Sequence, residues 1–553
     1  MNRKIEPNPL TLTNLINNSI QNFAASYAVS FVNGTPLTYS EMGRKMEEVS
    51  LLLFSLGLKK GDKVALLSHN MPNWVIAYFS IVSNGIIVVP ILPDFTIEEI
   101  QNVMIHSESK AIFISDRLLP KIQELDLPDL GAWILLDELS LIKNDRNLVN
   151  VNKIPNITVI EEDTAAIIYT SGTTGRSKGV MLSHRNLTFI AMQSYTFQPI
   201  NNHDVFLSLL PLSHTYENTI GMIYPIMYGS VIYYLEKPPT PAALLPALAK
   251  IRPTMMLAVP LIMEKLFKSQ IQSKFEASKF RSMIYKTPLF RILIHRFAGK
   301  KLYQSFGGRI KFFGIGGAKI DYRVERFLKE ARFPYAIGYG LTETSPLLAG
   351  AGTHQTKLQS TGFAVQGVDL KINNPNSKGI GEIWAKGPNV MQGYFKNPEA
   401  TAEVISNDGW FSTGDLGRFD SHKRLYIKGR MKNTIVGASG ENIYPEDIET
   451  IINDQQFVLE SLVIEEDGFL VAKVLLDLDN LEKNIEHFKS VIEDKKEKHL
   501  IWVNNFTKEV NAKLNRISQI KRIDIMDEPF EKTASQKIKR FLYTKQNKKN
   551  KKS

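Results

Sequence analysis

The 553-residue chain contains no cysteine. Disulfides, thiolate metal centres and a cysteine nucleophile are therefore excluded. Long apolar runs are missing as well, since the longest, near residues 220–235, is broken by Pro225 and Gly229 and is too short to span a bilayer. The first residues, Met1-Asn-Arg-Lys-Ile-Glu-Pro7, also lack the apolar core of a signal peptide. We therefore expect a cytoplasmic protein.

Acidic residues are missing from the last part of the chain. The net charge is +11, with 67 basic and 56 acidic side chains. Between Lys537 and Ser553 there are eight basic residues and no acidic one. Subtracting these eight charges from +11 leaves +3, which is ordinary for a chain of this size, so we expect no nucleic-acid partner. Residues 546–553 are expected to form a solvated basic tail, with a weak peripheral contact to anionic membranes as the alternative.

The length and the apolar pattern indicate a layered fold with more than one domain. A chain of 553 residues is too long for a single hydrophobic core. Helix-length segments such as 96–107 and 241–250 separate short apolar runs that are typical of strands. These runs are 64–68, 86–91, 111–115, 165–169, 205–210, 255–259 and 310–314. Strands that alternate with helices predict α/β layers with largely parallel sheets.

Two later regions differ from this alternation. Residues 382–385 and 425–427 lie among Gly and Asp turns and predict short antiparallel strands. After residues 429–433 a smaller unit follows, with strands expected at 462–465 and 470–476. We therefore predict an α/β fold, with a large N-terminal domain of layered α/β sheets that carries a small antiparallel β subdomain, and a small C-terminal α/β domain.

The most informative segment is residues 168–184, where glycines and hydroxyls alternate in a loop. Its glycines allow backbone N–H groups to converge, and its hydroxyls and Lys178 add donors and a positive charge. Besides Lys178, the loop carries Thr170, Ser171, Gly172, Thr173, Thr174, Gly175 and Gly179. We therefore predict a polyphosphate-binding loop. It is not a Walker A loop, which would need a glycine at position 177.

The same loop contains a second pattern. Gly175-Arg-Ser-Lys-Gly179 matches the G-x-S-x-G elbow of serine hydrolases, which would make Ser177 a nucleophile. An elbow serine sits on the turn directly after its strand, whereas several loop residues intervene here. A surface loop without a ligand is the remaining alternative.

Further blocks follow this loop along the chain. They are Leu210–His214, Gly314–Ala318, Gly338–Thr344, Ser412–Leu416, Lys428–Asn433, Ser439–Pro445 and Lys532–Lys537. In sequence and in order, the loop and these blocks resemble the adenylate-forming superfamily, which includes acyl-CoA synthetases, luciferases and the adenylation domains of peptide synthetases. The resemblance covers nearly the whole chain.

This resemblance implies a reaction in two halves. ATP and a carboxylate give an acyl-adenylate and pyrophosphate, and a thiol then attacks the acyl carbon and releases AMP. ATP, Mg²⁺ and CoA are the implied cofactors and co-substrate. The first half brings a carboxylate toward a polyanion, so cations and oriented dipoles must cancel charge at the α-phosphorus.

The phosphates and the metal have implied binding residues. Lys178, Thr170 and residues 171–175 would hold the β- and γ-phosphates, and Thr342 would contact the α-phosphate. Glu343 matches the magnesium ligand, and a hard carboxylate oxygen suits a metal that takes few protein ligands. The alternative for Thr342 and Glu343 is a polar turn with a capping glutamate.

The nucleoside has implied contacts in three later blocks. Tyr339 would lie flat on the adenine, and small residues would admit the other side of the ring. These small residues are Gly316, Gly317 and Ala318. Asp415 would accept both ribose hydroxyls, and Arg430 would make a second ribose contact. Taken alone, Asp415 has the alternative role of a turn or capping residue.

Lys537 matches the catalytic lysine, whose ammonium would bridge the substrate carboxylate and the α-phosphate. The family usually has glycine before this lysine, whereas this chain has Gln536. A glutamine is strained if the position needs a positive φ. Ser177 is a milder departure, because proline is commoner there. The alternatives are that Lys537 is one more lysine of the basic tail, or that the chain binds acyl-adenylate without turnover.

The resemblance also implies a mobile C-terminal domain, with domain 1–430, domain 431–545 and a hinge at Lys432. Rotation about the hinge would withdraw Lys537 and bring Gly440 and Glu441 toward the site, opening a channel for the pantetheine arm of CoA. A hinge needs only residues that absorb a backbone change, so lysine is acceptable. His214 would border the acyl carbon as a gate or positioning residue.

The block Leu210–Asn218 and residues 306–313 resemble those of long-chain acyl-CoA synthetases. Residues 214–259 are rich in Met, Ile, Tyr and Leu, which is compatible with an apolar tunnel and equally with plain core. A long-chain fatty acid, with ATP and CoA, is therefore the expected substrate. Transfer to a carrier-protein thiol and an aryl-acid substrate are the alternatives.

Overall fold

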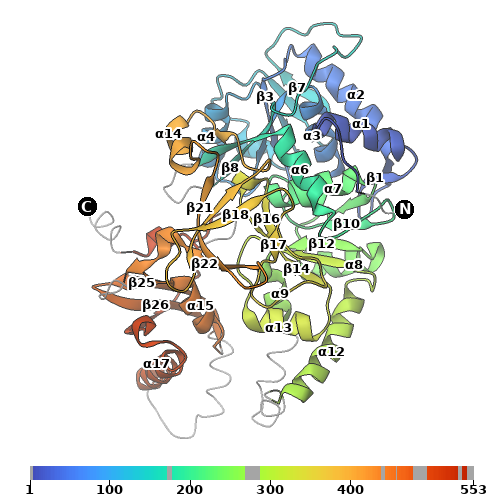
Figure 1. The fold of residues 1–553 in the computed structure, drawn as a ribbon. Helices are drawn as coiled ribbons and strands as arrows, with labels where there is room; N and C mark the ends of the chain where they lie inside the picture. The colour runs from blue at the N-terminus through green and yellow to red at the C-terminus, as the bar shows by residue number, and fades with distance from the viewer. Residues whose placement is uncertain are drawn as a thin grey trace.

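The computed structural model describes residues 4–170, 177–267, 285, 287–436, 442–455, 457–477, 495–533 and 538–544. Two large sheets form the body of the molecule, and a smaller unit lies at its edge (Figure 1). Every element named below lies within these residues. None of the helices in this part of the chain is long and apolar enough to cross a membrane.

The first large sheet has eight strands in the order β20-β9-β8-β4-β3-β5-β6-β7. The strands from β8 to β6 in this order run parallel, while β7, β9 and β20 pair antiparallel with their neighbours. Parallel strands buried on both faces need continuous apolar runs, which explains why they were predictable. The strands are β3 (Lys63–Leu67), β4 (Ile87–Ile91), β5 (Ala111–Ile114), β6 (Ala132–Leu135), β7 (Ser140–Asn144), β8 (Thr164–Thr170), β9 (Lys178–Ser183) and β20 (Gly393–Tyr394).

The second large sheet has seven strands in the order β14-β13-β12-β10-β11-β1-β2, all parallel except β2. The strand predicted at 310–314 begins two residues later, because the pairing with β12 starts at Phe312 opposite Met255. The strand predicted at 205–210 ends at Ser208. The strands are β1 (Tyr27–Phe31), β2 (Leu37–Thr38), β10 (Val205–Ser208), β11 (Val231–Tyr234), β12 (Met255–Ala258), β13 (Phe312–Ile315) and β14 (Tyr335–Ile337).

A central helical layer joins the two sheets, because one apolar cluster unites its helices with strands of both. Helix α3 is apolar on all sides, and every residue from Trp74 to Val82 is buried, as expected for a helix enclosed by protein. The layer contains α1 (Leu12–Asn22), α2 (Tyr39–Ser55), α3 (Pro72–Ser83), α6 (His184–Ser194), the π-helix η1 (Glu217–Ile223) and α7 (Tyr224–Met227).

Further helices cover the outer faces. Helices α4 (Ile97–Ser107) and α5 (Leu119–Ile122) pack in the cluster on the eight-stranded sheet. Thr96 and Glu99 form a capping box that starts α4 where the sequence predicts a helix. The cluster on the seven-stranded sheet draws on four helices. They are α8 (Pro241–Ile251), α9 (Pro260–Phe267), α12 (Pro288–Ser305) and α13 (Tyr322–Glu330).

Small antiparallel sheets lie beside the two large ones, as predicted from residues 382–385 and 425–427. One has the order β18-β19-β21-β22 and the other β15-β16-β17. Their strands are β18 (Asp369–Asn373), β19 (Gly381–Lys386), β21 (Phe411–Phe419), β22 (Leu425–Arg430), β15 (Tyr339–Gly340), β16 (Leu347–Gly350) and β17 (Phe363–Ala364). Helix α14 (Pro398–Val404) precedes β21.

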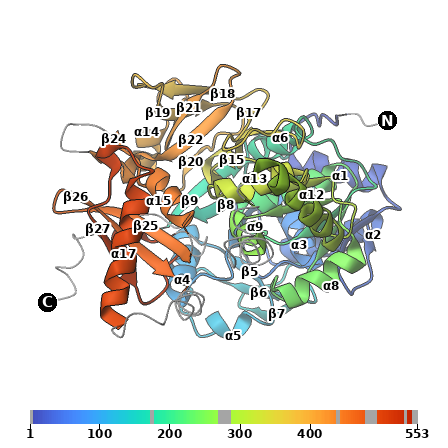
Figure 2. The same ribbon diagram turned by 90° about the horizontal axis from the view of Figure 1, so that it is seen from below.

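The smaller unit at the C-terminal side has its own apolar clusters, which contain only residues between Ile435 and Tyr543. Figure 2 shows this unit, in orange and red, at one side of the molecule. Its elements are β23 (Ile435–Val436), β24 (Asn442–Ile443), α15 (Pro445–Asn453), β25 (Val458–Glu466), β26 (Phe469–Leu476), α17 (Lys495–Asn511) and β27 (Arg522–Met526). The predicted α/β fold class is confirmed, whereas the domain limits at 430 and 545 stay predictions.

Candidate active site

The predicted phosphate loop joins two antiparallel strands. Lys178 is the first residue of β9 and pairs with Thr170, the last residue of β8. The next residue is Gly179, where a larger residue would not fit, because a Cβ there would lie 2.9 Å from Ile167 Cγ2. The predicted loop residues Ser171, Gly172, Thr173, Thr174 and Gly175 lie outside the described residues.

The hydrolase alternative does not fit this local structure. A nucleophile elbow is a turn between a strand and a helix. Ser177 instead directly precedes the antiparallel strand β9. The G-x-S-x-G match is therefore a coincidence of spacing.

Lys178 and Glu343 are brought together by a tyrosine that the sequence analysis missed. Strand β20 pairs with β9, with Tyr394 opposite Val180. The Lys178 ammonium lies 4.6 Å from the centre of the Tyr394 ring, and the Tyr394 hydroxyl donates to Glu343 Oε1 at 3.0 Å. Burial, and then the nearby Glu343 carboxylate, raise the pKa of Tyr394. The phenol therefore keeps its proton and acts as a donor to the carboxylate.

The turn that carries Thr342 and Glu343 is held from several sides. It is a single 3₁₀ turn, η3 (Thr342–Thr344). The Met391 N–H donates to the Glu343 carbonyl at 2.9 Å. The buried Asn389 amide donates to the carbonyls of Thr344 and Leu347 at 3.1 and 3.0 Å. These bonds fix the backbone at Glu343 and in the residues that follow it.

The arrangement fits a magnesium ion that is shared with substrate phosphates. In the described part of the chain, no three His, Cys, Asp or Glu side chains gather into a metal cage. Magnesium usually takes one or two carboxylates and completes its shell with phosphate oxygens and waters. Glu343, across the Tyr394 ring from Lys178, supplies such a hard oxygen beside the cation that is predicted to bind phosphate.

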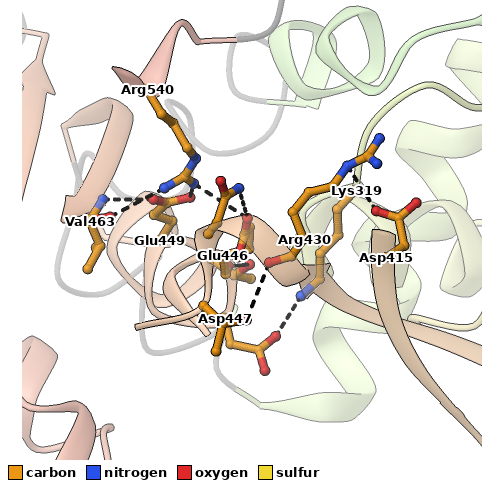
Figure 3. Close-up of polar contacts among 11 residues, drawn as sticks. Lys319, Asp415, Arg430, Glu446, Asp447, Glu449, Val463 and Arg540 are labelled. Carbon is orange, nitrogen blue, oxygen red and sulfur yellow. Dashed lines mark hydrogen bonds and ion pairs between the residues drawn. The ribbon is translucent and has the colours of Figure 1, made fainter. Parts of the chain in front are cut away.

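Tyr339, Asp415 and Arg430 form a connected group. The Tyr339 hydroxyl donates to Asp415 Oδ2 at 2.8 Å, and Arg430 Nε lies 2.9 Å from Asp415 Oδ1. Asp415 and Arg430 face each other across β21 and β22, so the strand register places them together (Figure 3). Burial, followed by the Asp415 charge, raises the pKa of Tyr339. Three residues predicted from separate blocks thus share one site.

The glycines of the Gly314–Ala318 block lie at the carboxyl end of β13, beside the end of its parallel neighbour β14, which is followed by Tyr339 at the start of β15. Ligands of parallel sheets bind at such ends. Gly316 packs under the Tyr216 ring, since a Cβ there would lie 3.1 Å from Tyr216 Cε1. Gly317 has φ +84°, which a side chain would strain. These glycines therefore place no side chain on the surface beside Tyr339.

His214 lies in a tight turn that is tied to a buried glutamate. The His214 N–H donates to the Pro211 carbonyl at 2.9 Å, and the side-chain oxygen Oδ1 of Asn70 accepts from the Leu212 N–H at 2.9 Å. The Asn70 amide donates at 3.0 Å to the Ser208 hydroxyl, which donates at 2.6 Å to Glu217 Oε1. The turn is therefore connected to the first residue of η1.

Glu217 is a second residue that the sequence analysis missed. It is 1% exposed, and burial raises its pKa to about 8. Gly221 makes room for its carboxyl group, since a Cβ there would lie 2.6 Å from Glu217 Cδ. Glu217 therefore carries a proton at neutral pH and acts as a neutral hydrogen-bonding group, connected through Ser208 and Asn70 to the turn that carries His214.

The smaller unit contacts, through α15, the elements that are predicted to bind the nucleotide. Asp447 lies 3.0 Å from Lys319 and 3.6 Å from Lys428 (Figure 3). Asp454, which follows α15, pairs with Arg323. Lys319 directly follows the Gly314–Ala318 block, so α15 stands over one side of the predicted adenine site.

The predicted hinge Lys432 is exposed on the 3₁₀ turn η4 (Met431–Asn433), between β22 and the smaller unit. The neighbouring Asn433 amide donates to Glu446 at 2.6 Å. The predicted Gly440, Glu441 and Lys537 lie outside the described residues. Near the end of the described chain, Arg540 pairs with Glu449 of α15 (Figure 3).

Comparison with known proteins identifies a family and relatives that match most of the chain. The model of the AMP-binding enzyme family matches residues 17–395, more than half of the chain. A long-chain-fatty-acid–CoA ligase of Rattus norvegicus is 28% identical over 514 residues, which cover 85% of this chain and 77% of the relative.

Two further relatives extend this picture. A long-chain-fatty-acid–[acyl-carrier-protein] ligase of Arabidopsis thaliana is 29% identical over 538 residues, with 80% of this chain and 72% of the relative covered. The solved structure of ATP-bound MatB from Rhodopseudomonas palustris has a TM-score of 0.76 at 22% identity, over 97% of this chain and 99% of that chain. The two chains therefore share their fold.

Proposed function

Because this chain belongs to the AMP-binding enzyme family, we propose that it activates a long-chain fatty acid with ATP and transfers the acyl group to CoA. The carboxylate attacks the α-phosphorus of ATP, pyrophosphate leaves, and the CoA thiol then attacks the acyl carbon and releases AMP. The similarity to a long-chain-fatty-acid–CoA ligase supports this proposal. The observation that carries it is that Tyr394 joins Lys178 to Glu343 while Asp415 joins Tyr339 to Arg430.

In the first half-reaction, positive charge and donors are needed around the triphosphate. We assign Lys178 and Thr170 to the β- and γ-phosphates, together with the loop residues 171–175, and Thr342 to the α-phosphate. Glu343 would hold the magnesium ion, which when bound neutralises phosphate charge. Tyr394 keeps the Glu343 carboxylate turned toward Lys178 by donating to Oε1.

The nucleoside would lie against the group formed by Tyr339, Asp415 and Arg430. The Tyr339 ring would take the adenine, with Gly316, Gly317 and Ala318 on its other side. Asp415 would accept the ribose hydroxyls, and Arg430 Nε, 2.9 Å from Asp415 Oδ1, holds this carboxylate in place for that purpose. Loss of either charge would leave the other without its partner in the site.

The smaller unit is assigned a role in each half-reaction. Lys537 would bridge the substrate carboxylate and the α-phosphate during adenylation and would leave the site when the unit turns about Lys432. Gly440 and Glu441 would then border the path of CoA. His214, held by the turn connected to Glu217, would border the acyl carbon.

The acceptor thiol has one specific competitor. The similarity to a long-chain-fatty-acid–[acyl-carrier-protein] ligase favours a carrier-protein thiol as a second candidate. The test is an assay of pyrophosphate release and thioester formation with ATP and a series of fatty acids of increasing chain length. CoA and acyl carrier protein are offered separately, and an aryl acid is included among the substrates.

We expect pyrophosphate release only with ATP and a long-chain acid, followed by thioester with CoA. Asp415→Asn should lose this activity, whereas Asp420→Asn, a control in the neighbouring exposed turn of the same antiparallel sheet, should keep it. Thioester with carrier protein alone would move the assignment to the second candidate. Release of acid from an ester without ATP would contradict both.

A further inference from the structure

Helix α12 exposes four large apolar side chains on one face. The exposed fractions are 67% for Leu289, 52% for Phe290, 54% for Leu293 and 64% for Phe297. At positions i, i+1, i+4 and i+8 they lie on the same side of the helix. Single exposed apolar residues are ordinary, but four within nine residues on one helix face form a contiguous surface that favours a binding partner.

The same face carries positive charge. Arg296, Lys300 and Lys301 are exposed on α12, and the helix contains no acidic residue. The Lys301 ammonium lies 4.6 Å from the centre of the Phe297 ring, so cation and apolar side chains are interleaved. Among the described residues, none of these three cations takes part in an ion pair. These three cations and the four apolar side chains together form the α12 outer face, which consists of Leu289, Phe290, Leu293, Arg296, Phe297, Lys300 and Lys301.

The opposite side of α12 is fixed to the protein. Arg291 donates to both oxygens of Glu330 on α13 at 2.9 and 3.1 Å, and His295 Nδ1 lies 2.7 Å from Glu330 Oε2. Gly299 allows close packing, since a Cβ there would lie 2.4 Å from Ala331 Cβ. Figure 1 shows α12 at the lower margin of the molecule. The outer face therefore stays turned to solvent without distortion of the helix.

We propose that the α12 outer face docks on the surface of an anionic phospholipid bilayer. Leu289, Phe290, Leu293 and Phe297 enter the boundary between headgroups and acyl chains, where apolar side chains leave water. Arg296, Lys300 and Lys301 then lie at headgroup level and pair with lipid phosphates. The inference stands on exposure and charge and does not rest on the proposed function.

Charge complementarity selects this occupant over a second copy of the chain. Face-to-face association of two copies would bring together two sets of three cations without acidic partners. An anionic lipid surface instead attracts each cation while the apolar side chains are buried. The α12 outer face is also separate in sequence from the basic tail 546–553, so the two contributions to lipid binding can be measured independently.

The test uses the full-length protein and sedimentation with vesicles. One set of vesicles contains phosphatidylcholine alone, and the other contains phosphatidylcholine and phosphatidylglycerol in roughly equal parts. We expect binding to the anionic vesicles that weakens as salt is raised. The double variant Phe290→Gln/Phe297→Gln and the double variant Lys300→Gln/Lys301→Gln should each lower the partition coefficient at least about tenfold.

Three controls make the result specific. Leu148→Gln replaces an equally exposed leucine, 58% exposed, elsewhere on the chain and should leave binding within about twofold. A chain that ends at residue 545 lacks the basic tail and should also bind within about twofold. If the phenylalanine pair impairs folding, seen as a lowered melting temperature, Leu289→Gln/Leu293→Gln replaces it.

Several outcomes would overturn the proposal. Binding that persists in both α12 variants, or that is lost only with the tail, would remove α12 from the lipid contact. A dimer in analytical ultracentrifugation that the phenylalanine pair dissociates would make the face a contact between copies instead. Ligase activity on a water-soluble substrate should be unchanged in every α12 variant, which separates this test from that of the proposed function.

Discussion

Replacing Tyr394 with phenylalanine removes one hydroxyl between the predicted metal ligand and the predicted phosphate lysine. The ring stays over Lys178, at 4.6 Å in the parent, while the 3.0 Å hydrogen bond to Glu343 is lost. A hydrogen bond to a charged group contributes about 1.5–3 kcal/mol. Each 1.4 kcal/mol is about tenfold in an equilibrium constant. We therefore expect the apparent affinity for magnesium in adenylation to fall about 10- to 100-fold, the usual range for a group that orients a metal ligand.

The assay is pyrophosphate release as a function of magnesium concentration at fixed ATP and fatty acid. Tyr335→Phe is a matched control, because its hydroxyl donates to the buried Glu325 carboxylate at 3.2 Å, away from Glu343. That variant should lose similar stability and keep the magnesium response of the parent. In a Glu343→Gln background, Tyr394→Phe should have little further effect, because the two changes remove the same interaction.

Two results would refute this reasoning. An unchanged magnesium curve in Tyr394→Phe would show that the hydrogen bond does not orient Glu343 for the metal. Equal shifts in Tyr394→Phe and Tyr335→Phe would show a general effect of lost stability. Additive losses in the double variant would place Tyr394 in a role separate from Glu343.

Four further substitutions address the two glutamates, the catalytic lysine and the hinge. Glu343→Gln should keep the melting temperature and lower pyrophosphate release by about two orders of magnitude, and an unchanged rate would remove the metal assignment. Lys537→Ala should form no acyl-adenylate from acid and ATP, yet it should convert supplied acyl-adenylate and CoA to thioester. Lys432→Pro should show the opposite pattern, forming acyl-adenylate but little thioester, because proline fixes the backbone φ at the hinge. Equal loss of both half-reactions in Lys537→Ala would contradict domain alternation. Burial raises the pKa of Glu217 from 4.5 to about 8, so the folded chain retains a proton that the unfolded chain releases. Stability should therefore fall as pH rises from about 4.5 to 8, by up to about 1.4 kcal/mol per pH unit, and Glu217→Gln should flatten this slope in melting curves.

Much of the fold could be predicted because the central strands are buried on both faces. Such strands are short continuous apolar runs, so the run 111–115 appears as β5 and 255–259 as β12, each within one residue. Strand ends were less predictable, because they depend on pairing partners. Phe312 begins β13 because Met255 stands opposite, and nothing local distinguishes it from Ile310.

Motif residues of the site could be named from the sequence, but their connections could not. Tyr394 and Glu343 are 51 residues apart, and their bond exists because β20 pairs with β9 beside the η3 turn. Glu217 looks like a surface residue in the sequence, and only the packing of η1 buries it. The residues around it, 217–230, are core in the structure, whereas the acyl tunnel proposed for 214–259 stays a prediction.

Helix α12 shows the opposite difficulty. An exposed helix is normally recognised by apolar residues on one side only. In α12 the buried side holds Arg291 and His295, while the solvent side holds Phe290 and Phe297. Because both sides mix polar and apolar residues, the one-sided pattern is lost. The orientation of α12 follows from its contacts with Glu330 and Ala331, which are distant in sequence.

The contacts of α15 set an energy scale for movement of the smaller unit. Asp447 and Asp454 pair across the predicted hinge with Lys319, Lys428 and Arg323, and the Asp447 pairs are about one-third exposed. Partly exposed ion pairs contribute up to about 1 kcal/mol each. These three ion pairs together therefore favour the orientation seen here by up to about 3 kcal/mol, corresponding to roughly a hundredfold excess at low salt. If the smaller unit turns about Lys432 as predicted, a ligand that binds the other orientation about 10⁴-fold more tightly would reverse a hundredfold ratio, so the occupancy of the two orientations would follow which of nucleotide or CoA is bound.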